Sequence, residues 1–217
     1  MQPAADQPAP EAAPAREPSA SRCPAAIAVF LGIMLAVLAA DLGLKHWTFN
    51  TPAVAGEPVF FHPDHAGPVI APHQPRPVVP GVLQLELVAN PGAVFGIGAG
   101  HRWVFIGVSL VAIAVVGVIF LRSSARAWPT HLALALILGG ALGNLYDRIR
   151  YSVVRDMLHL FPGWELPFGW TWTGGDARLY PWIFNIADVA LVAGVLLMIA
   201  ITLVRELRPQ AEQSAPG

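Results

Sequence analysis

The sequence predicts an all-α integral membrane protein with four transmembrane helices and a small extracytoplasmic β-sheet with loops. Of its 217 residues, 55% are hydrophobic and only 12% are charged, whereas a soluble domain has about 25% charged residues. Apolar stretches recur along the chain, each long enough to cross roughly 30 Å of hydrocarbon at about 1.5 Å per residue.

Composition also excludes several classes of function. The net charge of -1 and the absence of a basic cluster argue against a nucleic-acid partner. The single cysteine, Cys23, cannot form an internal disulfide. His62, His65 and His73 are spaced irregularly and no HExxH motif occurs, so neither a metal site nor a cofactor is predicted.

The first 24 residues are rich in Ala, Pro, Glu and Ser and predict a disordered tail. A membrane domain follows over residues 25–204, and residues 205–217 form a second polar tail. The first span is predicted over residues 25–47. The layout of Arg22 and a short apolar core also resembles a cleaved signal peptide, but the apolar character resumes after Asp41.

A loop and a strand connect the first two spans. Residues 48–81 are rich in Pro, His and Gly and predict a loop outside the bilayer. Leu83, Leu85 and Leu87 then alternate with polar residues, which is the pattern of a half-buried strand. This strand leads into an Asn-Pro-Gly turn at residues 90–92.

The remaining spans are predicted over residues 103–121, 129–147 and 182–204. A tryptophan stands at one end of each of the four spans, as interfacial aromatics do: Trp47, Trp103, Trp128 and Trp182. Four spans place both termini on one side. Arginines are denser in the tails and in the connection between spans two and three, which predicts cytoplasmic termini.

Polar and charged residues, which are energetically unfavourable inside a membrane, lie at the end of the third span and the start of the fourth. Within a span, such residues face a protein interior or a wet cavity rather than lipid. Asp156 and Asp188 each lie near a span end, and no other nucleophile has an obvious basic partner. Two neighbouring carboxylates resist ionising together, so one serves as acid and the other as base. We expect these aspartates to form an acid/base pair.

Structural roles are the alternative for the other polar residues. Asp147 is expected to pair with the adjacent Arg148. The amides of Asn90, Asn144 and Asn185 are equally suited to capping or cross-linking helices. Gly139 and Gly143 form a small-xxx-small pattern, which is typical of helix packing.

Asp41 and Lys45 are spaced as a helical ion pair. Spacing alone favours a pair that reaches out to the interface at the end of the helix. We expect it to support the fold rather than to do chemistry, so exchanging the two charges should retain more activity than either single change.

In order and placement, these motifs resemble the lipoprotein signal peptidases (signal peptidase II) over residues 27–204. The matching positions are Asp41 and Lys45; Asn90, Gly92, Val94 and Phe95; Gly139 to Arg148 without a mismatch; Val154 and Asp156; and Phe184 to Asp188. Met157 and Ser152 depart from the family's Phe and Gly. Asp156 and Asp188 lie 32 positions apart, which is long for the family; the added Trp-rich segment, residues 163–181, is expected over the membrane surface.

The resemblance implies an aspartic endopeptidase that removes signal peptides from prolipoproteins before a diacylglyceryl-modified cysteine. It implies catalytic roles for Asp156 and Asp188, and substrate-binding or dyad-supporting roles for Asn90, Gly92, Asn144, Arg148 and Asn185. It implies supporting roles for Asp41, Lys45, Gly140, Gly143, Asp147, Val154 and Ala187.

The expected partners are a lipid-modified prolipoprotein and membrane lipid, and the protein is expected to be a monomer. Its expected location is the bacterial inner membrane, as a multi-pass protein. One rival function is a proton-coupled transporter or channel component, since intramembrane aspartates also relay protons. A transporter usually shows internal repeats, and none is evident here. A second rival is a noncatalytic assembly factor.

Overall fold

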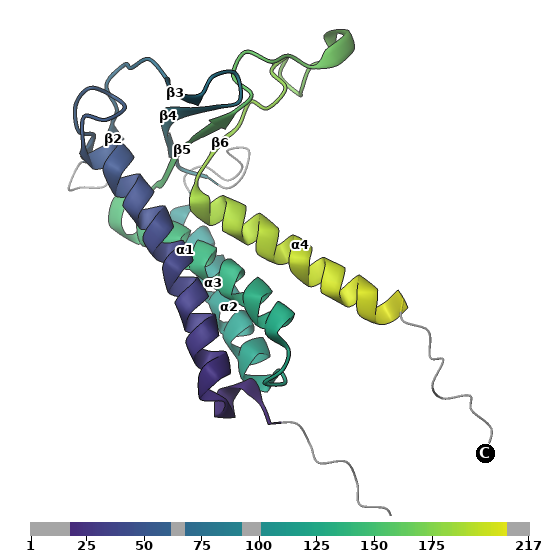
Figure 1. Ribbon diagram of the computed structural model, residues 1–217. Coiled ribbons are helices and arrows are strands. Elements are labelled where there is room, and N and C mark those ends of the chain that lie inside the picture. Colours follow the sequence, from purple (N-terminus) through teal and green to yellow (C-terminus); the bar gives the residue numbers. More distant parts are fainter. Residues whose placement is uncertain (1–17, 62–67, 93–100, 208–217) are drawn as a thin grey trace, which may run out of the picture.

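A computed structural model of the protein describes residues 18–61, 68–92 and 101–207. Its long helices are α1 (Pro24–Asn50), α2 (Arg102–Arg122), α3 (Trp128–Tyr151) and α4 (Ile186–Leu207). These four are the helices in the described ranges that are long and apolar enough to cross a membrane. The strands lie at one end of the helices, and α1 begins and α4 ends towards the other (Figure 1). "All-α" therefore describes only the membrane part.

Helix α3 is the centre of the bundle and packs against α1, α2 and α4. Small residues allow this close approach. A Cβ at Gly139 would lie 2.9 Å from the backbone oxygen of Met34 on α1, and a Cβ at Gly140 would overlap the backbone oxygen of Ala187 on α4. On α4, a Cβ at Gly194 would lie 2.7 Å from the backbone oxygen of Ala133. Glycine thus holds three helices at contact distance.

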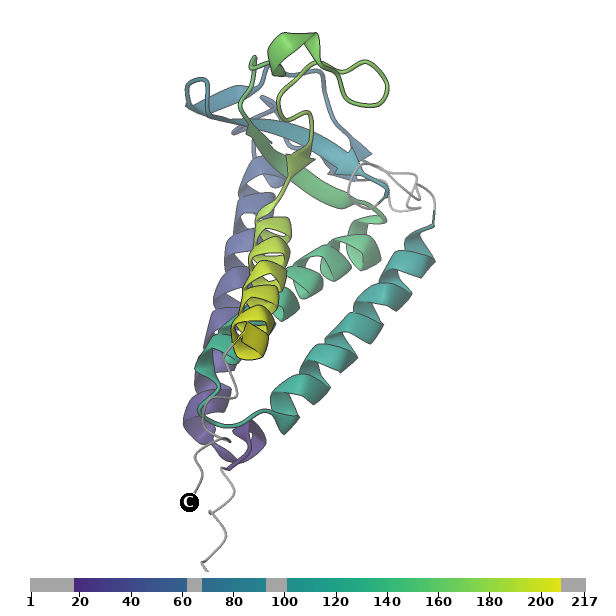
Figure 2. The ribbon, with the colours of Figure 1, turned by 90° about the vertical axis from the view of Figure 1, so that its right-hand side faces the viewer.

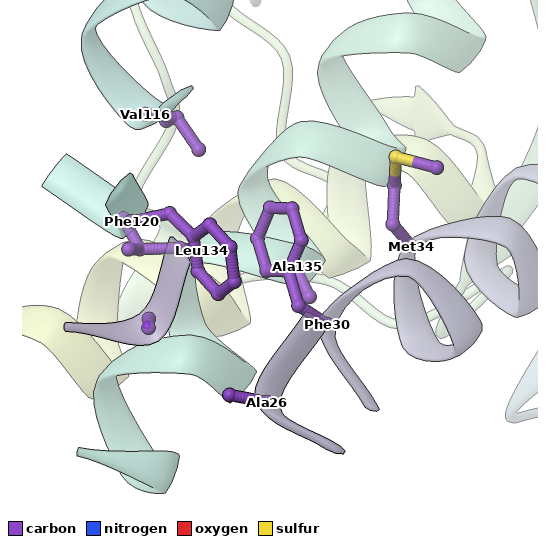
Figure 3. Close-up of a cluster of buried hydrophobic side chains, with 8 residues drawn as sticks. Ala26, Phe30, Met34, Val116, Phe120, Leu134 and Ala135 are labelled. Carbon is purple, nitrogen blue, oxygen red and sulfur yellow. The ribbon is translucent and has the colours of Figure 1, made fainter. Parts of the chain in front are cut away.

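Two apolar clusters fill the interior. The first lies at the end of the bundle away from the sheet, where the rings of Phe30 and Phe120 stack with centroids 4.0 Å apart. Figure 3 shows these rings beside Leu134 and Ala135 of α3. The second cluster lies where α1 meets the sheet and is made of Phe49, Val54, Val59, Leu85, Leu87 and Met157.

The main sheet is antiparallel and has the strand order β3-β4-β5-β6. Its strands are β3 (Arg76–Val79), β4 (Leu83–Asn90), β5 (Val154–Leu160) and β6 (Ile183–Phe184), and a separate antiparallel pair is formed by β1 (Phe60–Phe61) and β2 (Pro68–Val69). The predicted strand is confirmed as β4, with Leu85 and Leu87 buried. Its pairing with β5 brings Asn90 opposite Val154, which joins two of the sequence motifs.

Element boundaries differ from the predictions in several places. Helix α1 runs to Asn50 rather than ending at residue 47, and α3 runs to Tyr151 rather than ending at residue 147. Helix α4 begins at Ile186 rather than at residue 182, because Ile183 and Phe184 pair with β5 as β6. The tail predicted over residues 1–24 includes a short 3-10 helix, η1 (Ala20–Arg22), in which the Ala20 N–H donates to the Ser123 oxygen at 2.8 Å. Residues 18–24 thus pack against the end of α2.

The Trp-rich segment lies on the far side of the sheet from the helices (Figures 1 and 2). It contains the short helix η3 (Pro167–Gly169), in which Phe168 is 89% exposed. The strands stand between its tip and the helix ends (Figure 1), and the expectation that this segment lies over the membrane surface stays a prediction. Its returning limb, residues 178–184, comes back to the sheet and leads into α4.

Candidate active site

Asp156 lies in β5, where alternate side chains face opposite sides of the sheet. One side carries Val154, Asp156 and Leu160, which line a cavity. Across the sheet, Asn90 is the diagonal neighbour of Asp156, and its side-chain N–H donates to Asp156 Oδ2 at 3.1 Å. From the start of α4, the Asn185 side chain donates to Asp156 Oδ1 at 2.6 Å. Both carboxylate oxygens therefore accept an amide hydrogen bond.

Asp188 is held by the first turn of α4. Asn185 is the residue before the helix, and its side-chain oxygen accepts from the Asp188 N–H at 2.9 Å. In return, the Asn185 N–H donates to Asp188 Oδ2 at 3.2 Å. This reciprocal pair is a capping box, and the positive end of a helix stabilises negative charge in its first turn.

Asn144 connects the two aspartates to the interior of the bundle. Its Nδ2 donates to Asp188 Oδ1 at 2.7 Å, and its Oδ1 accepts from Asn185 Nδ2 at 3.1 Å. Asn185 thus contacts Asp156, Asp188 and Asn144 together. The structure brings all three predicted asparagines, Asn90, Asn144 and Asn185, into direct contact with one or both aspartates.

Burial and a neighbouring charge act together on Asp156. Desolvation is the larger cause and the nearby Asp188 carboxylate the second, and they raise the pKa of Asp156 to about 7 against the hydrogen bonds from Asn90 and Asn185. Desolvation and a like charge both penalise the ionised form of an acid. Asp156 therefore holds a proton over much of the range below neutral pH.

Asp41 and Lys45 lie beneath this site, and neither reaches the interface. Both side chains are fully buried, with Lys45 Nζ 2.7 Å from Asp41 Oδ2. Lys45 Nζ also lies 3.0 Å from Asp147 Oδ2 and donates to Asn144 Oδ1 at 3.2 Å. Asp41 Oδ1 accepts from the Ala187 N–H at 2.9 Å. The expected interfacial pair is instead a buried cross-link between α1, α3 and α4.

The predicted pairing of Asp147 with Arg148 is wrong. Asp147 binds Arg155, whose Nη2 and Nε lie 2.8 Å and 3.1 Å from Oδ1, and whose backbone N–H donates to Oδ2 at 3.0 Å. Adjacent residues on a helix point about 100° apart, so Arg148 faces the cavity instead. Its Nη2 donates to the Gly92 oxygen at 3.1 Å, and its guanidinium lies over the Phe105 ring.

A cavity of about 980 Å³ opens beside the two aspartates. Its polar lining includes Asn90, Asn144, Arg148, Asp156 and Asp188. Its apolar walls come from α2, α4 and the segment before β6, and include Val108, Ala112, Tyr180, Pro181, Trp182, Phe184, Val189, Val192 and Leu196. The arrangement presents two carboxyl groups to the end of a mostly apolar groove.

Some residues of the site were missed by the sequence reasoning. Tyr180 and Trp182 have ring centroids 5.3 Å apart and form part of the cavity wall, which the Trp, Gly and Pro content of this segment did not reveal. The position of Arg155 could have been predicted, because adjacent residues of a strand face opposite sides and Arg155 therefore points away from the cavity, where it pairs with Asp147. Val94 and Phe95 lie outside the described residues. Within those residues, no cluster of three or more His, Cys, Asp or Glu side chains is arranged to hold a metal ion.

Comparison with known proteins places this arrangement in a family. The family model described as signal peptidase (SPase) II matches residues 33–204. The chain belongs to the signal peptidase II family. Proteins named lipoprotein signal peptidase are similar in sequence: that of Moorella thermoacetica is 39% identical over 58% of this chain and 73% of its own. That of Lactobacillus gasseri is 31% identical over 78% of this chain and 88% of its own.

Solved structures agree on the fold of this signal peptidase II. A bacterial membrane enzyme determined by the in meso method at 2.3 Å resolution superposes with a TM-score of 0.65 at 23% identity, covering 88% of this chain and 96% of its own. A second bacterial membrane enzyme, at 1.9 Å resolution, gives a TM-score of 0.61 at 22% identity over 82% and 94%. The family and the four apolar helices make the protein a multi-pass bacterial membrane protease.

Proposed function

We propose that the protein is an aspartic endopeptidase that removes the signal peptide from prolipoproteins before a diacylglyceryl-modified cysteine. One observation carries the proposal: Asn185 joins Asp156 and Asp188 at the wall of a large apolar cavity. Membership of the signal peptidase II family supports the substrate. Nothing in the family or the site favours a proton-coupled transporter.

The two aspartates have different environments, which assigns their roles. Asp156 is buried and its pKa is raised to about 7, so it is the acid. The Asp188 carboxylate lies in the first turn of α4 and accepts two hydrogen bonds, from Asn144 Nδ2 and from the Asn185 N–H, so it is the base. Asp188 takes a proton from water as the water oxygen attacks the scissile carbonyl carbon. Asp156 protonates the carbonyl oxygen, which gives a tetrahedral intermediate with two hydroxyl groups. Asp188 then gives its proton to the amine nitrogen as the C–N bond breaks, and one hydroxyl group returns a proton to Asp156 as the carboxylic acid product forms.

The cavity walls suit a lipid-modified peptide. The groove is lined by Val108 and Ala112 of α2 and by Val192 and Leu196 of α4, and both helices carry exposed apolar side chains. Acyl chains would lie between these helices. Arg148 and Asn90 would contact the peptide near the scissile bond, since they line the same cavity as the aspartates.

The proposed location is the bacterial inner membrane, with a monomer whose termini are cytoplasmic and whose sheet is extracytoplasmic. The start of α1 and the end of α4 both lie away from the sheet (Figure 1). Reporter fusions after Ala125 and Gly217 should report the cytoplasm, and fusions near Gly67 and Gly174 the opposite side. An exported signal from the fusion at Gly217 would overturn this orientation.

The activity is tested with purified protein and a synthetic precursor in two forms, with and without the diacylglyceryl group on its cysteine. We expect cleavage immediately before the cysteine of the modified form only. EDTA and a thiol reagent should leave the rate unchanged, because the proposed mechanism uses two carboxyl groups. Inhibition by either reagent, or equal cleavage of the unmodified form, would count against the proposal.

A further inference from the structure

A second cavity lies at the end of the bundle opposite to the aspartates. It has a volume of about 520 Å³, is open to the surface, and lies between the end of α2, the connection to α3, the first turn of α3 and the last turn of α4. Its lining residues are Val118, Ile119, Arg122, Ser123, Ser124, Ala127, Thr130 and Arg205. None of them belongs to the proposed catalytic site.

Two guanidinium groups give this cavity a positive charge. Arg122 is in the last turn of α2 and Arg205 in the last turn of α4. Arg205 Nη2 donates to Thr130 Oγ1 of α3 at 3.4 Å, which directs its guanidinium across the cavity. Within the described ranges, neither arginine forms an ion pair, and Glu206 is the acidic residue nearest in sequence to Arg205. The cavity therefore favours an anion.

An apolar wall continues from the arginines along α2. Val118 and Ile119 precede Arg122 by four and three positions, so they lie on the same face of the helix. They are 46% and 41% exposed. Nearby, Trp128 at the start of α3 is 67% exposed, as an aromatic side chain at the membrane interface would be. Two cationic groups at the end of an apolar stripe on membrane helices match a phospholipid rather than a soluble anion.

We propose that this cavity binds one anionic phospholipid, with its phosphate between Arg122 and Arg205 and an acyl chain against Val118 and Ile119. A single-phosphate anionic headgroup such as phosphatidylglycerol brings net negative charge to two cations. A zwitterionic headgroup carries its own ammonium into the same space and loses that advantage. The lipid would bridge α2 and α4, the two helices that flank the catalytic groove at its other end.

The test measures lipid binding by the full chain in phosphatidylcholine nanodiscs or detergent, using native mass spectrometry with added phosphatidylglycerol. The variant is Arg122→Gln with Arg205→Gln. The matched control is Arg22→Gln with Arg126→Gln, which removes the same charge at the same end from residues outside the cavity lining. At roughly 5-fold per arginine, the cavity variant should bind phosphatidylglycerol roughly 25-fold more weakly, and the control should bind like the original protein.

Three outcomes would overturn the proposal. Equal weakening in the cavity variant and the control would mean general surface attraction. Inorganic phosphate binding as tightly as phosphatidylglycerol would mean a soluble-anion site. Phosphatidylcholine binding as tightly would mean no charge preference. Ile119→Ser provides a second variant that keeps both arginines: it should also weaken phosphatidylglycerol binding severalfold, and unchanged binding would contradict the acyl contact.

Discussion

Exchanging the charges of Asp41 and Lys45 tests the buried cross-link beneath the aspartates. The double change Asp41→Lys with Lys45→Asp keeps one acid and one base four positions apart. In an exposed helical pair, such an exchange restores the attraction. Here it should not, because each side chain has further partners with a fixed polarity.

The structure shows why rescue fails. An Asp at position 45 would face Asp147, whose Oδ2 now lies 3.0 Å from Lys45 Nζ, and would place two acids together. A Lys at position 41 would face the Ala187 N–H, which needs an acceptor. Both side chains are fully buried, so water cannot replace the lost partners. The exchange should be as damaging as either single change.

The expected magnitude follows from that burial. Breaking a buried ion pair costs about 3–5 kcal/mol, and 1 kcal/mol shifts the midpoint of a chain this size by about 2–4 °C. The thermal unfolding midpoint of each single variant and of the double should therefore fall by roughly 6–20 °C. Purified variants in the same detergent are compared by intrinsic tryptophan fluorescence during heating.

An exposed pair provides the matched control. Asp176 and Arg178 form an ion pair at 2.6 Å on the Trp-rich segment, with the Arg178 side chain 50% exposed and that of Asp176 32% exposed. Exchanging their charges should leave the unfolding midpoint close to that of the original protein, since exposed pairs contribute little to stability. If the Asp41/Lys45 exchange also kept its midpoint, the fixed-polarity reasoning would be refuted, and the sequence-based expectation of partial rescue would stand.

Three further predictions follow from the site and its packing. The raised pKa of Asp156 favours its protonated form in the folded state, so its contribution to stability is present below about pH 4 and is lost as pH rises from about 4 to 7. Loss of this proton should also lower kcat/KM above about pH 7. A rate that stays constant up to about pH 9 would contradict the assignment of Asp156 as the acid. Gly143→Ala should lower the unfolding midpoint, because the added Cβ would collide with Asp41 Oδ2. The control Gly107→Ala should be tolerated, because its added Cβ meets nothing within 4 Å. Equal unfolding midpoints for the two variants would refute the packing argument. The His159 ring contacts Glu86 Oε2 at 2.9 Å and the backbone oxygen of Tyr180 at 3.2 Å, and Tyr180 lines the cavity. His159→Leu removes both contacts and should raise KM roughly 2- to 10-fold with kcat nearly unchanged. Steady-state kinetics that show a loss only in kcat would contradict this positioning role.

The sequence predicted the elements of the fold well, because four long apolar stretches leave few other arrangements in a membrane. The start of α4 was missed, although Asn185 and Asp188 have the spacing of a capping box and so marked the true first turn. The span was instead predicted to begin at residue 182 because the residues from there onwards are apolar on average.

Partners within the site depended on tertiary contacts. Asp147 was assigned to Arg148 because the two are adjacent, yet helix geometry separates them and the β5 strand delivers Arg155 to Asp147. Lys45 and Asn144 are 99 positions apart and meet only when α1 packs on α3. Neither contact can be predicted from the spacing of the two residues along the chain. The aromatic wall at Tyr180 and Trp182 was likewise not predicted, because residues 178–184 reach the cavity only through the pairing of β6 with β5.

Single-turnover cleavage by Asp156→Asn and Asp188→Asn tests the central claim most directly. Each enzyme is supplied in excess over the lipid-modified precursor and at a concentration above the KM, and each variant is first shown to unfold at a midpoint near that of the original protein. Glu57→Gln, which makes the same carboxyl-to-amide change at an exposed residue, is the control and should cleave normally. General acid–base groups contribute about 10²–10⁴-fold, so each aspartate variant should lose at least roughly 100-fold in rate. A folded variant of either aspartate that retained more than roughly 5% of the rate would contradict a mechanism in which both carboxyl groups take part.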